Sequence, residues 1–267
     1  MSINTVQRGE LEYLVSDRIS VPHAFTTRRG GVSGGYLQSL NLGMHRGDSE
    51  ANVRENYRIL GEALGFSPAC MVLANQVHGD RVLCVDRADC RGADARDYPP
   101  CDALITACPD CALVVFTADC TPILLYDPRT GAVGAAHAGW RGTAACIAAR
   151  TVEAMQAHFG TRPEDIRAAI GPNIGPCCFE THGDVPQAMR QALGAQADPF
   201  LIPFGPEKFH VDLKGLNAHI LRLAGVTQID VSTDCTACQS SRFWSHRVTG
   251  GQRGSQGAVI VCKGGRK

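Results

Sequence analysis

The chain has 267 residues, of which 44% are hydrophobic and 19% charged, so it is long enough to bury a full core. Its 26 basic and 26 acidic side chains balance, which excludes overall charge as a means of holding nucleic acid or an anionic membrane. The N-terminal stretch lacks the basic and apolar regions of a signal peptide, and no run of about 18 apolar residues predicts a membrane span, so we expect a cytoplasmic protein.

Strands and helices alternate in the predicted elements. Apolar runs flanked by turn residues predict strands at 69–74, 81–86, 103–106, 112–117, 123–126, 132–137, 166–170, 226–231 and 258–262. Helical periodicity predicts helices at 50–64, 143–159, 184–193 and 213–224, with Thr143 and Asp212 as N-caps of the second and the last. Because no linker or repeat interrupts the mixture, we expect one α/β (mixed α+β) domain over residues 1–267.

Thirteen cysteines are scattered over the chain. Cytoplasmic thiols are kept reduced, so we expect them to be free and mostly packed as small hydrophobic side chains. Two CxxC pairs, Cys108–Cys111 and Cys235–Cys238, are too far apart in sequence for a zinc ribbon, and the sequence assigns them no shared metal.

Three segments place metal-binding side chains at the ends of predicted strands, beside glycine or proline. NQVHGD (75–80), TADCTP (117–122) and AHAGWRG (136–142) carry His78, Cys120 and His137. Two imidazoles and one thiolate suit a catalytic zinc ion, whose fourth position is left for water or substrate. Ordinary packing or hydrogen bonding in the core also explains each residue, and the spacing alone favours that explanation.

Eight segments, in order along the chain, resemble the laccase-domain family, also called multicopper polyphenol oxidoreductases or YfiH-like purine nucleoside phosphorylases. They are TTRRGGVS (26–33), SLNLG (39–43), NQVHGD (75–80), DALIT (102–106), ADCTPILLYD (118–127), AAHAGWRGT (135–143), AIGPNIGPCCFE (169–180), and CT with FWSHR (235–236, 243–247). The resemblance implies a compact four-layer α/β/β/α sandwich with zinc bound by His78, Cys120 and His137. It also implies phosphorolysis of purine nucleosides, with adenosine deamination and methylthioadenosine phosphorolysis as accompanying activities.

The family name also suggests copper as a cofactor. Blue-copper and trinuclear sites need many histidines, commonly in HxH pairs, and the nine histidines here include no such pair. We therefore expect zinc rather than copper.

The family motifs suggest roles for further residues. Arg28 is expected to act in catalysis as a phosphate clamp, with backbone N–H groups of Gly30 and Gly31 beside it, whereas Arg29 faces solvent. Asp119 is expected either to orient His78 or His137 or to cap a turn. The other residues that the motifs place at the substrate are Asn41, Gln76, Arg141, Cys178 and Arg247.

The C-terminal motif departs from the family pattern. His246 stands where the family often has tyrosine, and residues 247–253 (RVTGGQR) replace the family's second arginine and TGR, so the role of this segment stays open. Cys177, next to Cys178, is expected to pack.

Two other functions fit the same residues. Cys120 with His137 or His78 is a candidate Cys–His nucleophile pair, which suits an amidase that edits peptidoglycan precursors, as described for some bacterial members of the family. A non-catalytic module that binds metal or purine is the second alternative. The partners we expect are a purine nucleoside and phosphate, with no nucleic acid or membrane, while the preferred nucleoside and the choice between monomer and weak homo-oligomer stay open.

Overall fold

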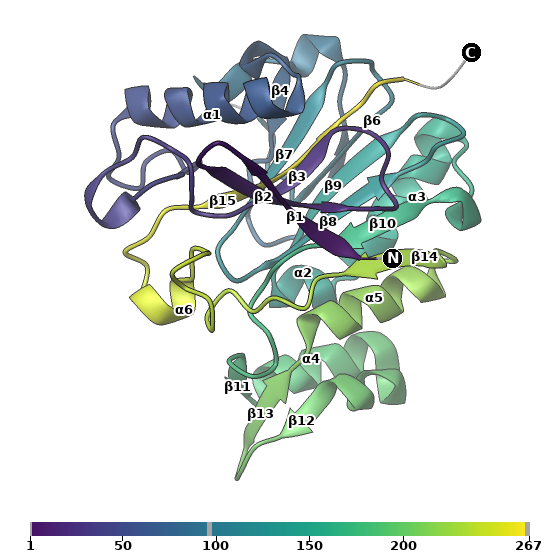
Figure 1. The fold of residues 1–267 in the computed structure, drawn as a ribbon. Coiled ribbons are helices and arrows are strands. Elements are labelled where there is room, and N and C mark those ends of the chain that lie inside the picture. Colours follow the sequence, from purple (N-terminus) through teal and green to yellow (C-terminus); the bar gives the residue numbers. More distant parts are fainter. Residues whose placement is uncertain (1, 95–97, 265–267) are drawn as a thin grey trace.

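The computed structural model describes residues 2–94 and 98–264. Two six-stranded sheets pack against each other and carry helices on their outer faces, which is the predicted α/β/β/α sandwich (Figure 1). The first sheet has the order β1 (Ile3–Arg8), β2 (Leu11–Ser16), β3 (His23–Thr26), β15 (Gln256–Val261), β7 (Ala112–Thr117), β4 (Met71–Leu73). The second has the order β14 (Gln228–Val231), β10 (Arg167–Ile170), β8 (Thr121–Tyr126), β9 (Val133–Ala138), β6 (Ala103–Thr106), β5 (Val82–Cys84).

Both faces of the second sheet are buried, because successive side chains of a strand point to opposite faces. Leu104 belongs to the core shared with the first sheet, and the adjacent Ile105 belongs to the core beneath α3 (Ile147–Phe159) and α5 (Leu213–Leu223). Helix α1 (Glu50–Leu64) covers the outer face of the first sheet through its apolar stripe (Figure 1).

A smaller three-stranded sheet projects from the sandwich at the lower end of the view in Figure 1. It consists of β11 (Glu180–His182), β13 (Lys208–Val211) and β12 (Leu201–Pro203), and it packs with α4 (Asp184–Leu193). The remaining helices are short: α2 (Trp140–Ala144), α6 (His246–Thr249), and the 3₁₀ helices η1 (Gly35–Leu37), η2 (Pro68–Cys70), η3 (Arg87–Asp89), η4 (Gly92–Asp94), η5 (Pro163–Asp165) and η6 (Gly194–Phe200).

All nine predicted strands are present, with ends shifted by a few residues, and the helices α1, α4 and α5 are confirmed. Asp212 caps α5 by accepting a hydrogen bond from the backbone N–H of Gly215, as predicted. The single helix predicted at 143–159 is wrong. Cys146 adopts a left-handed conformation (φ 58°) that divides it into α2 and α3, and Thr143 lies buried inside α2 instead of capping a helix.

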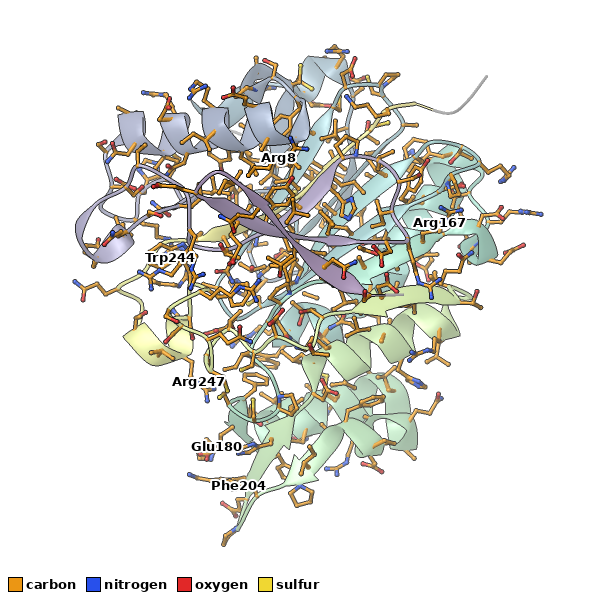
Figure 2. The ribbon with its side chains drawn as sticks, in the orientation of Figure 1. Arg8, Arg167, Glu180, Phe204, Trp244 and Arg247 are labelled. Carbon is orange, nitrogen blue, oxygen red and sulfur yellow. The ribbon has the colours of Figure 1, made fainter. Side chains whose placement is uncertain are left out.

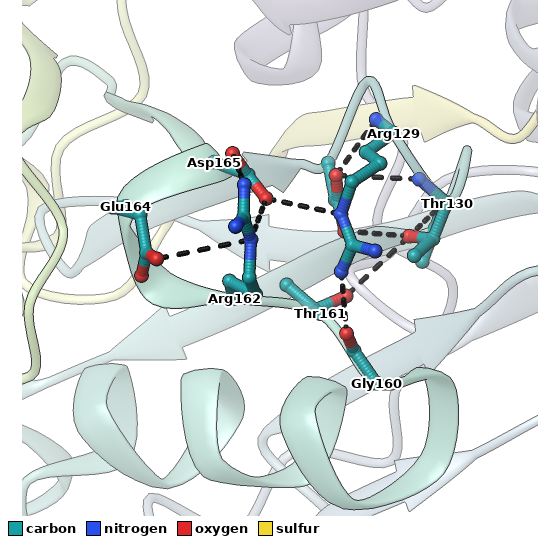
Figure 3. Close-up of polar contacts among 9 residues, drawn as sticks. Arg129, Thr130, Gly160, Thr161, Arg162, Glu164 and Asp165 are labelled. Atoms are coloured by element: carbon teal, nitrogen blue, oxygen red, sulfur yellow. Dashed lines mark hydrogen bonds and ion pairs between the residues drawn. The ribbon is translucent and has the colours of Figure 1, made fainter.

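The hairpin of β8 and β9 is anchored at its turn by a polar network (Figure 3). Arg129 in the turn donates to Asp165 Oδ2 (3.0 Å) and to the carbonyl of Gly160 (2.6 Å), which follows α3. Arg162 donates to both oxygens of Asp165. The turn is thereby tied to the helical layer. The opposite end of the same hairpin carries Cys120 and His137.

All thirteen cysteines are free thiols, as predicted. In the part of the chain that the structure describes, no helix is both long enough and apolar enough to cross a bilayer.

Candidate active site

Cys120 and His137 meet at the open end of the β8–β9 hairpin. Cys120 directly precedes β8, and the antiparallel register sets Pro122 opposite His137. Strand β6 lies beside β9, so Asp102, which precedes β6, is brought next to His137 as well. The backbone N–H of His137 donates to the carbonyl of Asp102 (2.7 Å), which fixes this arrangement.

A loop held by a single carboxylate brings His78 to the same place. The backbone N–H groups of Val77, His78 and Gly79 all donate to the carboxylate of Asp102, at 3.1, 3.0 and 2.7 Å. His78 itself has a left-handed backbone conformation (φ 61°), which the turn requires. Asp102 also accepts from Nδ1 of His137 (2.8 Å), so one buried carboxylate positions both histidines.

The ligand atoms of His78, Cys120 and His137 lie within 4.8 Å of one another. The Cys120 Sγ is 3.9 Å from Nε2 of His78, and the two imidazole rings are 4.9 Å apart in an edge-to-face arrangement. Because Asp102 occupies Nδ1 of His137, the Nε2 atom of that ring is left for a ligand. These donors fit a metal ion with three protein ligands and a fourth, open position.

Gly139 leaves room for this group of donors. A Cβ atom at this position would lie 3.0 Å from Cδ2 of His78 and 3.2 Å from Sγ of Cys120. Its φ of −68° is ordinary for any residue, so the close approach of the two side chains, and not the backbone conformation, favours glycine here.

The thiol and the imidazole shift each other's titration. Burial alone would raise the pKa of Cys120, but the neighbouring His137 and His78 lower it to about 6. Burial alone would lower the pKa of His137, but the charge of Cys120 and the hydrogen bond to Asp102 raise it to about 9. Without a metal ion, the pair is therefore a thiolate and an imidazolium near neutral pH.

These three residues form part of the wall of a cavity of about 400 Å³, within the size range of small-molecule sites. Aromatic and apolar groups form another part of the wall. The complete lining comprises Gly43, Met44, His45, Arg46, Leu73, Ala74, Asn75, Gln76, His78, Ala93, Tyr98, Phe116, Thr117, Ala118, Cys120, His137, Arg253 and Ser255.

Two arginines of this wall carry positive charge that is only partly matched. Burial and, to a smaller extent, the neighbouring charge of Arg46 together lower the pKa of Arg253 to about 10. Arg253 donates from NH1 to the carbonyl of Gly254 (2.9 Å), but its buried Nε finds no hydrogen-bond partner among the described residues. A guanidinium placed in this way is suited to binding an anion.

Gln76 is the predicted substrate residue that lies in the cavity wall beside the three metal-binding candidates. Its amide exchanges two hydrogen bonds with the backbone of Phe116, donating to the carbonyl (2.8 Å) and accepting from the N–H (2.6 Å). Gln76 thus fixes the strand end that presents the Phe116 ring to the cavity.

Arg28, predicted as the phosphate clamp, does not line the cavity. Its guanidinium stacks on the ring of Trp244 at 3.8 Å and donates to the carbonyls of Gln38 and Ser240. The N–H groups of Gly30 and Gly31 donate to Ser39 Oγ. The donors of the predicted anion site thus have partners within the protein, and the role of Arg28 as phosphate clamp stays a prediction. The adjacent Arg29 is exposed, as expected.

Asp119 contacts neither imidazole among the described residues. Orienting a histidine was one of the two roles predicted for Asp119, and in the structure it is Asp102 that orients His137. The carboxylate of Asp119 accepts from Thr236 Oγ1 (2.6 Å), Ser245 Oγ (3.1 Å) and the backbone N–H of Arg247 (2.7 Å). Asp119, which directly precedes Cys120 in sequence, therefore holds the turn that begins α6.

Four more predicted substrate residues lie outside the cavity wall. Asn41 is buried behind it, where its side chain bonds Gly43 and Ser255. Arg141 is exposed and stacks on Trp140. Arg247 donates to the backbone carbonyls of Cys178 and Glu180, at the junction of α6 with the small sheet (Figure 2).

Cys178, the fourth of them, belongs to a separate group of thiols. Its Sγ and those of three other cysteines lie within 4.8 Å of one another. We call the group Cys177, Cys178, Cys235 and Cys238 the four-cysteine cluster. Cys235 and Cys238 belong to the second CxxC pair, and the first pair, Cys108–Cys111, is not part of this group. The fold brings the second pair to Cys177 and Cys178, which lie in a loop distant in sequence.

Sequence reasoning missed Asp102, Tyr98, Arg46 and Arg253. Asp102 opens the DALIT segment, so its position before a strand that neighbours the HAGWRG strand was a usable signal. Arg253 lies in the diverged C-terminal segment, and the fold returns it to the cavity despite the altered spacing. Arg46 and Tyr98 lie in loops without periodic pattern, and no signal marked them.

The family model described as multi-copper polyphenol oxidoreductase laccase matches residues 22–263. A Deinococcus radiodurans protein named purine nucleoside phosphorylase is 42% identical over 94% of this chain and 92% of its own length. Purine nucleoside phosphorylase YlmD of Geobacillus stearothermophilus is 39% identical over 91% of this chain and 89% of its own length.

Solved structures show the same fold. Hypothetical protein YfiH of Bacillus licheniformis superimposes with a TM-score of 0.91 at 35% identity, covering 98% of this chain and 99% of its own. The YlmD structure from Geobacillus stearothermophilus gives a TM-score of 0.90 at 36% identity, covering 97% and 98%. The two large sheets and their helices are therefore shared with these two proteins over almost the full length of each chain.

Proposed function

The chain belongs to the multi-copper polyphenol oxidoreductase laccase family. We propose that it is a zinc-dependent purine nucleoside phosphorylase. The proposal takes its reaction from relatives that carry the name purine nucleoside phosphorylase. The observation that carries it in this chain is one cavity whose wall combines three side chains able to bind a metal ion, two arginines and aromatic rings.

Zinc suits the donor set better than copper does. Two imidazoles and a thiolate with an open fourth position match catalytic zinc sites. A trinuclear copper centre needs many more imidazoles, and His78 and His137 are the two that share this group of ligands. When bound, the ion would supply positive charge to a phosphate oxygen or to a water molecule at its open position.

Arg253 and Arg46 would hold the phosphate. Burial and the charge of Arg46 lower the pKa of Arg253, and an anion between the two guanidinium groups would relieve the repulsion between them. The free Nε of Arg253 adds a directed donor for a phosphate oxygen. Phosphate held in this way is positioned to attack C1′ of the ribose, so that the C1′–N9 bond breaks and ribose 1-phosphate forms.

The purine would lie against Tyr98 and Phe116. The hydroxyl of Tyr98 donates to the carbonyl of Asp89 (2.6 Å), and the backbone of Phe116 is held by Gln76, so both rings are fixed before a substrate arrives. A base gains affinity by stacking on such rings. Asn75 and His45 are polar groups of the same wall that can hydrogen-bond the departing base, which takes up a proton as it leaves.

Two finer activities follow from the same site. Adenosine deamination would replace the amino group at C6 of the base by oxygen from water, with release of ammonia, in the same cavity. Phosphorolysis of methylthioadenosine would use the same arginines and needs only room for the 5′ substituent. We propose both as accompanying activities of the one cavity.

A cysteine hydrolase is the second candidate, favoured by one specific observation. Asp102, His137 and Cys120 form a relay in which the carboxylate bonds Nδ1 of the histidine and the thiol has a pKa of about 6. Such a relay activates a nucleophilic thiolate for an amide, as an editing amidase would require. A thiolate bound to a metal is not free to attack, so the two candidates exclude each other at this residue.

The deciding experiment measures products from inosine and adenosine, with and without phosphate. The proposal expects hypoxanthine from inosine only when phosphate is present, with ribose 1-phosphate formed in equal amount, and loss of this activity in His78→Ala. Amide hydrolysis without phosphate, abolished by Cys120→Ser and unaffected by His78→Ala, would instead establish the cysteine hydrolase. Tight nucleoside binding without any turnover would establish a binding module.

A further inference from the structure

The four-cysteine cluster lies outside the cavity described above and has no part in the proposed reaction. Cys177 and Cys178 lie in the loop between β10 and β11, and Cys235 and Cys238 lie in the loop between β14 and α6. We propose that this cluster binds one zinc ion in a structural tetrathiolate site. The assignment is independent of the proposed function.

The sulfur positions suit a single ion. Zinc–thiolate bonds of about 2.3 Å in a tetrahedron place the sulfur atoms about 3.8 Å apart. Here the Sγ of Cys238 is 3.5 Å from that of Cys177 and 3.3 Å from that of Cys178, and all four sulfur atoms lie within 4.8 Å of one another. A small movement of the side chains is therefore enough to surround one ion, while the sulfur–sulfur distances are well beyond that of a disulfide bond.

The backbone at Cys235 is shaped for a thiolate. The N–H of Gly175 and that of Cys238 both point at Sγ of Cys235, at 3.2 and 3.5 Å. The bond from Cys238 joins the last cysteine of the CxxC turn to the first. Hydrogen bonds of this kind orient thiolate ligands and tune their properties. Two backbone donors directed at one buried sulfur favour a thiolate ligand over an apolar thiol.

Glycine and a buried lysine complete the surroundings. A Cβ atom on Gly175 would lie 3.2 Å from Sγ of Cys177 and 3.5 Å from Sγ of Cys235, so the glycine leaves space for the cluster. Lys214 is buried and lines the same surface hollow as Cys177 and Cys235, while its ammonium donates to the carbonyl of Asp234 (2.7 Å). Its positive charge offsets part of the negative charge that four thiolates and a divalent ion carry together.

An ion in this site would join two loops that already share a few hydrogen bonds. The N–H of Thr236 donates to the carbonyl of Asn173, and the Thr236 hydroxyl donates to Asp119, the neighbour of Cys120. The cluster therefore lies behind the turn that leads into the candidate active site. Closing two distant loops with one ion stabilises the folded chain, because the unfolded chain offers no such preformed site.

The test is metal content per chain under reducing, oxygen-free conditions. We expect wild-type protein to hold about one zinc ion more than Cys238→Ala, and Cys84→Ser, which alters an exposed thiol outside the cluster, to match wild type. The His78→Ala variant lacks one of the three candidate ligands of the cavity, so metal that it still binds reports on the cluster. Cobalt bound to that variant should show the absorption of a tetrathiolate centre.

Three results would overturn the assignment. One is equal metal content in Cys238→Ala and wild type. Another is a cobalt spectrum of His78→Ala without four-thiolate character, a measurement that needs no change in the cluster and so decides the matter if Cys238→Ala does not fold. The third is a different chemistry of the cluster in freshly prepared reduced protein, seen either as a disulfide between cluster cysteines by mass or as an iron–sulfur chromophore.

Discussion

Nδ1 of His137 lies 2.8 Å from Oδ1 of Asp102, and both residues are buried. The same carboxylate receives three backbone N–H groups from the loop that carries His78. Burial alone would raise the pKa of Asp102, but the hydrogen bonds from His137 and from Gly79 and Val77 hold it below its ordinary value. A single charged acceptor thus sets the positions of both imidazoles, and it does so from outside the group of metal-binding donors.

Replacing Asp102 by asparagine should weaken zinc binding about 10- to 100-fold, because an amide cannot accept all four donors and leaves His137 free to rotate. Zinc affinity measured against a chelator of known affinity tests this. The control is Asp80→Asn, which alters a partly exposed carboxylate paired with Arg150 and should leave zinc affinity unchanged. An unchanged affinity in Asp102→Asn would refute the positioning role.

Gly139→Ala should reduce zinc affinity without unfolding the protein. The added methyl group would lie 3.0 Å from the His78 ring and 3.2 Å from Sγ of Cys120, so these side chains must move apart. Gly183→Ala is a matched control, since a Cβ there meets nothing within 4 Å. Equal zinc affinity and equal melting temperature in the two variants would mean that the donors are not held as tightly as described.

Arg253→Met should raise KM for phosphate about 10-fold or more, corresponding to the loss of a charged hydrogen bond of about 1.5–3 kcal/mol, with a smaller effect on KM for inosine. Arg28→Met should leave KM for phosphate unchanged and lower the melting temperature, because its guanidinium bonds backbone carbonyls and stacks on Trp244. Steady-state kinetics with phosphate varied, together with thermal unfolding, measures both effects. The reverse pattern would restore Arg28 as the clamp.

Phe116→Ala should raise KM for the nucleoside about 5- to 100-fold, the range that corresponds to losing about 1–3 kcal/mol of base stacking. The phosphate KM should change little, since the ring lies on the aromatic part of the wall. Phe204→Ala, which removes an exposed ring on the small sheet, serves as the control. Equal nucleoside KM in the two variants would place the purine elsewhere.

The reactivity of Cys120 in zinc-free protein should follow its lowered pKa. Since the thiolate is the reactive form and the pKa is about 6, the rate of alkylation by iodoacetamide should rise through pH 6 and be near its maximum at neutral pH. Cys84, whose pKa is raised by burial and by Asp86 and Asp89, should react only at higher pH. Peptide mapping by mass spectrometry follows both sites.

Zinc should protect Cys120 from this alkylation. The protection comes from coordination, because a thiolate bound to the ion is no longer free to attack. Rapid alkylation of Cys120 in zinc-loaded protein would contradict coordination and favour the cysteine hydrolase.

Much of the fold followed from local patterns, because the strands of the two central sheets are apolar runs with clear ends. The strands β1, β2 and β3 were missed. β1 is polar and largely exposed and is held by its hairpin with β2, and β3 is a short segment that pairs with β15, a strand distant in sequence. The break at Cys146 could not be predicted, because a left-handed residue other than glycine is stabilised by the packing of α2 and α3 and not by its own preference.

Of the candidate site, the structure brings together the three residues that the family motifs proposed as metal ligands, and the motifs keep these donors unchanged. The surrounding pocket was predicted less well, because a motif does not say which side of a loop faces the substrate. Arg28 and Arg141 lie in family segments and yet bond or stack within the protein. Arg253 lies in a diverged segment and reaches the cavity, since its position depends on the return of β15 between β3 and β7.

The most direct test measures phosphate-dependent hypoxanthine release from inosine before removal of metal, after its removal, and after zinc is restored. We expect the activity to disappear with the metal, to return with zinc, and to be absent from both His78→Ala and Cys120→Ala. Full activity in metal-free protein, or unchanged activity in both variants, would contradict it.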